Sequence, residues 1–138
     1  MKVIFLAMLI FFVTAESAES KSLNSHPFEG NYIFSHAQGC ANSDSKLEIY
    51  NELNRKAEFR LETYACFPKD APNLGYIEGA MDINYVSKVG LFIGNDDNEG
   101  CIVVFVFQRD AVTTASFGTC NVGQGADPNR EFTRAKRK

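Results

Sequence analysis

Cysteine is the residue type with the clearest chemistry in this 138-residue chain, which contains Cys40, Cys66, Cys101 and Cys120. An even number of cysteines behind an export signal favours disulfide bonds. No interval between them resembles the C-x-x-C spacing of a zinc site, so we expect no metal at these residues. Each neighbouring pair brackets a stretch with the pattern of one β-hairpin. We therefore predict two hairpin disulfides, Cys40–Cys66 and Cys101–Cys120.

The registers of these hairpins depend on which residues face each other. A Cys101–Cys120 pair centres the second turn on residues 109–112. In the first hairpin, a Cys40–Cys66 pair centres the turn on Leu53, whereas cross-strand charge pairing favours a register shifted by two positions. The shifted register opposes three sets of charges: Lys46 with Glu62, Glu48 with Arg60, and Glu52 with Lys56. Both registers of the first hairpin stay open at this point.

Other residue types with catalytic or ligating potential occur in patterns that have simpler explanations. Ser35 and His36 are adjacent, and neighbouring side chains on an extended chain point apart, so they form no catalytic dyad. The carboxylates of 58–62 and 78–82 recur at alternate positions, which is typical of a solvated strand face. Residues 95–100 imitate the start of a calcium loop, but the twelfth position is Val106 rather than glutamate. We predict no catalytic residue, no metal and no cofactor.

The N-terminal residues have the pattern of a secretory signal. Lys2 precedes an apolar run that ends in small residues, so we predict a signal peptide over 1–15, a flexible lead-in over 16–27 and a single β domain over 28–138. No later segment is long and apolar enough to span a bilayer. The formal net charge of −3 argues against a general nucleic-acid binder. We expect an exported protein, periplasmic or secreted.

The mature chain consists of short alternating segments separated by turn signals. This pattern predicts about eight antiparallel strands in a meander, forming a small closed or partly open barrel, with a sandwich as the alternative. In segment 74–83 the inward residues are Ile77, Gly79, Met81 and Ile83. Segment 86–93 is predicted to turn Val89, Leu91 and Ile93 inward, with Gly90 at a bend or bulge.

Recognition residues are expected on the loops and strand ends, because strands fix the geometry while loops vary. The predicted partner-binding residues are the aromatics Tyr64, Phe67 and Tyr76 and the polar residues Asp96, Asp97, Asn121 and Gln124. These features favour a small exported protein-binding protein, an inhibitor or immunity-type protein that blocks a hydrolase or toxin in the periplasm.

Two other functions remain open. One is a barrel that carries a small apolar ligand, since Gly79 and Gly90 leave room inside; the phenylalanines Phe59, Phe92, Phe105 and Phe107 would fill it. The other is a secreted hydrolase that uses two of the strand carboxylates.

Overall fold

The computed structural model describes residues 26–35, 44–64, 74–121 and 127–136, which form a closed barrel of eight antiparallel strands. The elements are β1 (Gly30–Phe34), β2 (Ser45–Leu53), β3 (Lys56–Tyr64), β4 (Leu74–Asn84), β5 (Val89–Ile93), η1 (Asp96–Asn98), β6 (Cys101–Phe107), β7 (Ala111–Gly118) and β8 (Glu131–Arg134). Each strand pairs with the next one in sequence, and β1 closes the ring against β8. The predicted all-β meander is confirmed, and of the predicted architectures it is the closed barrel.

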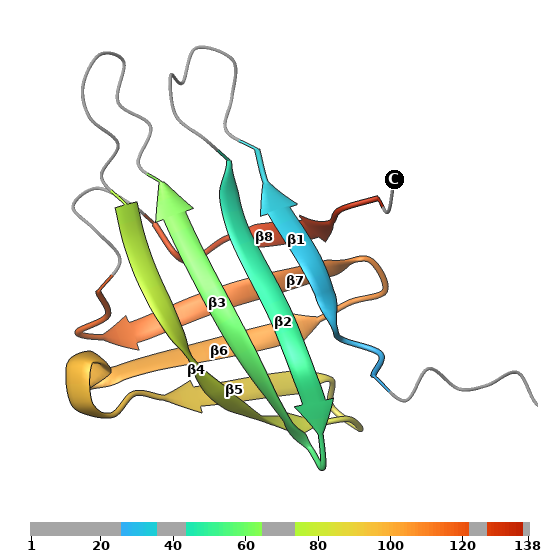
Figure 1. Ribbon diagram of the computed structural model, residues 1–138, viewed down its shortest axis with the longest axis horizontal. Helices are drawn as coiled ribbons and strands as arrows, with labels where there is room; N and C mark the ends of the chain where they lie inside the picture. The colour runs from blue at the N-terminus through green and yellow to red at the C-terminus, as the bar shows by residue number, and fades with distance from the viewer. Residues whose placement is uncertain (1–25, 36–43, 65–73, 122–126, 137–138) are drawn as a thin grey trace, which may run out of the picture.

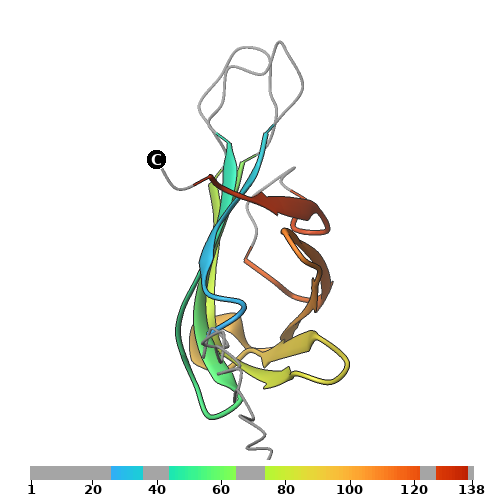
Figure 2. The same cartoon turned by 90° about the vertical axis from the view of Figure 1, so that its right-hand side faces the viewer.

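The barrel is flattened into two layers. Strands β1–β4 form one layer, and β5–β8 cross behind it at a steep angle (Figures 1 and 2). The side chains between the layers are apolar and largely aromatic, with Phe59 in edge contact with Phe92 and Phe105 at centroid distances of 5.0 and 4.8 Å. Within the described ranges, the chain has no helix long and apolar enough to cross a bilayer.

Two of the interior glycines are already covered by neighbouring side chains. A Cβ atom on Gly79 would lie 2.4 Å from the Phe92 ring, and one on Gly90 would lie 2.8 Å from the Met81 sulfur. The space that these glycines leave is therefore occupied by protein. The inward face of β4 is as predicted, with Ile77, Met81 and Ile83 buried.

The β2–β3 hairpin adopts the register that charge pairing favours. Lys46 faces Glu62 and Glu48 faces Arg60, with the turn at residues 54–55. The predicted opposition of Glu52 and Lys56 is wrong, because the register shifts between Tyr50 and Leu53 and Lys56 pairs with Leu53 instead. Asn51, inside this irregularity, has a φ of 51°. The bulge turns the Glu52 side chain inward, where it is buried.

Strand β5 presents the opposite face to the one predicted. Gly90 and Phe92 point into the barrel, whereas Leu91 and Ile93 are exposed. The prediction fails because every residue of β5 is apolar or glycine, so alternation alone cannot choose a face. The Phe92 ring fits over Gly79 and against Phe59, and this packing decides the orientation.

The predicted Cys101–Cys120 disulfide is present, although the strand register around it differs from the prediction. Cys101 pairs with Gly118 rather than with Cys120, and the turn spans residues 108–110. Gly118 has a φ of +79°, and a Cβ there would lie 1.9 Å from the carbonyl oxygen of Gly100. Glycine thus allows the chain to leave β7 and return Cys120 to a Cα–Cα distance of 4.6 Å from Cys101. Cys40 and Cys66 lie outside the described residues.

The buried carboxylate of Glu52 anchors the segment before β1 against one end of the barrel. Its Oε2 accepts hydrogen bonds from the backbone N–H groups of Phe28 and Glu29 at 2.9 and 3.2 Å, and its Oε1 accepts one from the Tyr85 hydroxyl at 2.8 Å. The Phe28 ring stacks on Phe107, with centroids 4.1 Å apart. The Arg134 guanidinium donates to the Glu29 carbonyl at 3.0 Å, which ties the segment to β8. Glu52 thus joins β2 to the segment before β1 and to Tyr85, and Arg134 joins that segment to β8.

The Tyr85 hydroxyl should lose its proton at an unusually high pH. Burial, followed by its hydrogen bond to Glu52, raises the pKa of Tyr85 to about 12 from its ordinary value of 10.0. A folded-state pKa above the unfolded value means that this contribution to stability is complete below about pH 10 and is lost as the pH rises through 12. An ultraviolet absorbance titration should show a late tyrosinate step that a Tyr85→Phe variant lacks. A Tyr85→Phe titration identical to that of the wild type would contradict this assignment.

Candidate functional site

The two ends of the barrel carry connections of different length. Turns 54–55, 85–88 and 108–110 join the strands at one end. The other end of the barrel carries the strand ends that the longer connections join (Figure 1). These connections are residues 35–44, 65–73, 94–100 and 119–130. The Cys101–Cys120 bond joins the last two of these connections at their bases. All four of these longer connections therefore start from a single end of the barrel, which we call the loop end.

The structure brings only some of the predicted partner-binding residues together. Tyr64 is the last residue of β3 and faces Leu74 on β4. The Tyr76 backbone N–H, on β4, donates to the Asn121 carbonyl at 3.1 Å, which links β4 to the segment after β7. Asp96 and Asp97 lie in η1, within the segment 95–100 that imitates the start of a calcium loop, and both are exposed. Phe67 and Gln124 lie outside the described residues, as does His36.

The Tyr76 side chain belongs to an ionic cluster on the outer face of β3 and β4. Its hydroxyl donates to the Glu78 carboxylate and accepts from Arg60 Nε at 3.0 Å. The bond to Glu78 raises the pKa of Tyr76 above its ordinary value, with Arg60 opposing the effect. Arg60 also lies 3.8 Å from Glu48 on β2. This tyrosine is therefore held by hydrogen bonds to a neighbour on β3 and a neighbour on β4.

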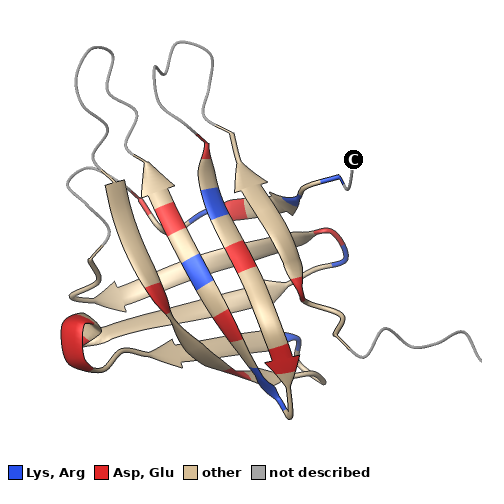
Figure 3. Cartoon of the chain, in the orientation of Figure 1, with Lys and Arg blue, Asp and Glu red and all other residues tan. Residues whose placement is uncertain are grey.

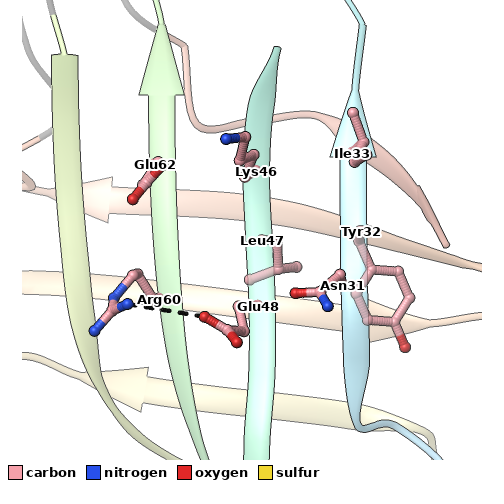
Figure 4. A pocket seen from close by; sticks show the side chains of 8 residues that line it. All are labelled: Asn31, Tyr32, Ile33, Lys46, Leu47, Glu48, Arg60 and Glu62. Carbon is pink, nitrogen blue, oxygen red and sulfur yellow. Dashed lines mark ion pairs between the residues drawn. The ribbon is translucent and has the colours of Figure 1, made fainter. Parts of the chain in front are cut away.

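The outer face of β2–β4, which we call the charged wall, carries opposite charges in facing positions. A shallow hollow of about 230 Å³ lies on it and extends to β1 (Figure 4). Its rim holds two basic residues, Lys46 and Arg60, each opposite an acid on the neighbouring strand. Each base of this face, Lys46, Lys56 or Arg60, is opposite an acid on a neighbouring strand, and the carboxylates at 58, 62, 78 and 82 stand on this open surface. The arrangement fits a solvated face and contains no enclosed acid–base pair.

Strands β5–β7 present an outer face of the opposite character, which we call the uncharged wall. Three rows of paired residues cross the three strands there. The rows are Ile93–Ile102–Phe117, Leu91–Val104–Ala115 and Val89–Val106–Thr113. Ile93 is 67% exposed and Phe117 58% exposed. Figure 3 shows these strands free of charge along their length, while β2–β4 are banded with it.

The uncharged wall has charges of opposite sign at its two ends. At the loop end, η1 and the residue after it place Asp96, Asp97 and Glu99 directly beyond the Ile93 row. At the other end, Lys88 and Arg109 lie in the turns that precede β5 and follow β6. Arg109 has a neighbour of opposite sign, Asp110, at 3.9 Å, and its side chain is almost fully exposed. The wall therefore runs from an acidic end through an apolar centre to a more basic end.

Contiguous exposed apolar surface of this kind marks interaction sites, because isolated apolar residues are common on protein surfaces but clustered ones are not.

No family model, curated protein or solved structure matches this chain. Among the described residues, no group of three or more histidine, cysteine or acidic side chains is placed to hold a metal ion.

The uncharged wall was not predicted from the sequence, because the outward residues of β5 were assigned to the core. A usable signal was nevertheless present in the neighbouring strand. All seven residues of β6 are apolar. In a closed barrel each strand has one face inside and one outside, so such a strand must expose apolar side chains. The alternation inside β6 is regular, with Val103 and Phe105 buried and Ile102 and Val106 exposed.

Proposed function

We propose that this chain is a small exported binding protein that docks its uncharged wall on a partner protein, a hydrolase or a toxin, and blocks it sterically. The observation that carries the proposal is the three-by-three array of uncharged side chains on β5–β7, bordered by acidic η1. A few anchor side chains contribute most of the binding energy of an interface, and Phe117 and Ile93 are the most exposed members of the array.

The rigidity of the scaffold supports the same proposal. The array lies on hydrogen-bonded strands rather than on loops, and the Cys101–Cys120 bond holds the connections beside it. A preformed surface loses little conformational entropy on binding, which favours tight association. The disulfide is also compatible with a protein that acts outside the cytoplasm. The predicted signal peptide, residues 1–15, lies outside the described residues.

The two alternative functions have less support. A carrier of an apolar ligand needs interior space, and the space beside Gly79 and Gly90 is taken by Phe92 and Met81. A hydrolase of the two-carboxylate type needs one carboxyl made more basic by its surroundings. The strand carboxylates instead stand on the open charged wall, where Arg60 contacts both Glu48 and Glu78.

Glutamate substitutions on the uncharged wall should weaken partner binding. Ile93→Glu and Phe117→Glu each place a charge in the proposed contact, and we expect at least a tenfold loss of affinity, equivalent to about 1.4 kcal/mol. The immobilised mature chain is used to capture its partner from the native extracellular or periplasmic fraction. Mass spectrometry identifies the captured protein, and its activity is titrated with the wild type and both variants.

Lys46→Glu, an exposed charge reversal on the charged wall, is the matched control and should leave capture and inhibition unchanged. Circular dichroism verifies that all three variants remain folded. Partner capture that is equally strong with Ile93→Glu and Phe117→Glu would disprove the uncharged wall as the contact. Partner activity that is insensitive to a saturating excess of the wild type would disprove the blocking function.

A further inference from the structure

The uncharged wall is too apolar to be left in water without cost. Three strands at about 4.8 Å spacing and five residues at about 3.3 Å give it a plane of roughly 14 by 17 Å. Eight of its nine outward residues are hydrocarbon side chains, and the ninth is Thr113. The charged wall on the opposite layer shows what an ordinary solvated face of this same barrel looks like (Figure 3). Something should cover the uncharged wall while no partner is bound.

The charges at the two ends of the wall indicate which molecule fits it. Asp96, Asp97 and Glu99 form the acidic end, and at the basic end Lys88 and Arg109 outnumber a single acid, Asp110, which lies 3.9 Å from Arg109. A second copy placed face to face by a two-fold axis that runs across the strands has its strand direction reversed. The acidic end of each copy then lies over the basic end of the other. A two-fold axis along the strands would instead oppose acid with acid, so electrostatics selects the antiparallel arrangement.

We propose that a second copy of this chain occupies the uncharged wall, forming an antiparallel two-fold dimer that masks the surface used for the partner. Such an interface is isologous: the same patch contributes on both sides, and each end contact occurs twice. This inference rests on the proposed function, because it describes the regulation of the same site. The dimer is the latent form, and the monomer is the form that binds the partner.

The size of the wall sets the strength of this dimer. Stable dimers bury about 800 Å² or more on each partner, and a plane of roughly 14 by 17 Å with its two charged ends falls below that. The dimer should therefore dissociate on dilution and exchange readily. A reversible mask of this kind leaves the wall accessible to a partner that binds more tightly, because the two compete for one surface.

Charge reversal at either end tests the arrangement directly. One variant carries Asp97→Lys and Glu99→Lys, which makes both ends basic, and the other carries Lys88→Glu and Arg109→Glu, which makes both ends acidic. Sedimentation velocity over a concentration series should show dimers for the wild type at high concentration and at least tenfold weaker association for each variant. An equimolar mixture of the two variants should associate again, because their ends are complementary in both contacts.

The remaining controls separate this inference from the proposed function. Leu91→Glu, in the middle row, should weaken the dimer, and Lys46→Glu should not. A wild type that is monomeric at every concentration, or variants that fail to associate when mixed, would overturn the dimer. If the dimer is overturned but the Ile93→Glu variant still fails to capture the partner, the proposed function is supported without the dimer. If the wild type dimerises as described but Ile93→Glu captures the partner as well as the wild type does, the dimer is supported and the proposed function is disproved.

Discussion

Replacing Glu52 with alanine should destabilise the folded protein by about 3 kcal/mol, because the change leaves buried donors without their acceptor. The carboxylate is 1% exposed and accepts from two backbone N–H groups and the Tyr85 hydroxyl. The Phe28 N–H, which is buried, cannot turn to water unless the segment before β1 moves away. Chemical denaturation of the oxidised protein measures the free energy of unfolding.

Glu58→Ala is the matched control for this substitution. Glu58 lies on the same hairpin but is exposed on the charged wall, so its removal should change the free energy of unfolding by no more than about 0.5 kcal/mol. The Glu52→Ala variant should also bring the pKa of Tyr85 back toward its ordinary value, since one of the two main causes of the raised pKa is removed. Equal destabilisation by the two alanine substitutions would show that the buried network has no special role.

Gly79→Ala should cost about 2 kcal/mol through overpacking of the barrel interior. The added Cβ would lie 2.4 Å from the Phe92 ring, and that ring is itself held in edge contact with Phe59. Phe92→Leu alone should also destabilise the protein, because it leaves a cavity beside Gly79. The double variant should lose less free energy of unfolding than the two single variants lose in total. The added methyl group then occupies space that the smaller side chain vacates.

This double-mutant cycle also tests the carrier hypothesis. Additive effects of Gly79→Ala and Phe92→Leu, or a Gly79→Ala variant as stable as the wild type, would mean that the interior has spare volume at this point. Gly75→Ala is a less suitable comparison because Gly75 is buried near the loop end. Ala80→Val, an outward change next to Gly79 on the same strand, is the appropriate control and should change stability little.

Much of the barrel could be predicted from local patterns. Alternation along β2, β3 and β4 is informative because one face is apolar and the other charged, so a shift by one residue would bury charges. Facing opposite charges then selected the correct β2–β3 register, with Glu48 opposite Arg60. The Cys101–Cys120 disulfide followed from the hairpin pattern between the two cysteines.

Three features could not be predicted in this way, and each depends on contacts between distant residues. The bulge that turns Glu52 inward is matched by donors that lie 24 and 33 positions away in the sequence. The β6–β7 register depends on the close approach of Gly118 to Gly100. The inward face of β5 depends on the fit between Phe92 and Gly79.

The amino-acid sequence by itself predicted an antiparallel meander with one solvated face and a disulfide between Cys101 and Cys120, because alternation and charge pairing act between neighbouring strands; the tertiary structure closed this meander into a barrel rather than a sandwich. Only the tertiary structure decided which apolar side chains of these strands are exposed. Strands such as β5 and β6 are apolar on both faces, and no periodic pattern can tell inside from outside in them. Packing of Phe92 against its neighbours across the barrel makes that choice for β5, and it leaves Ile93 in water.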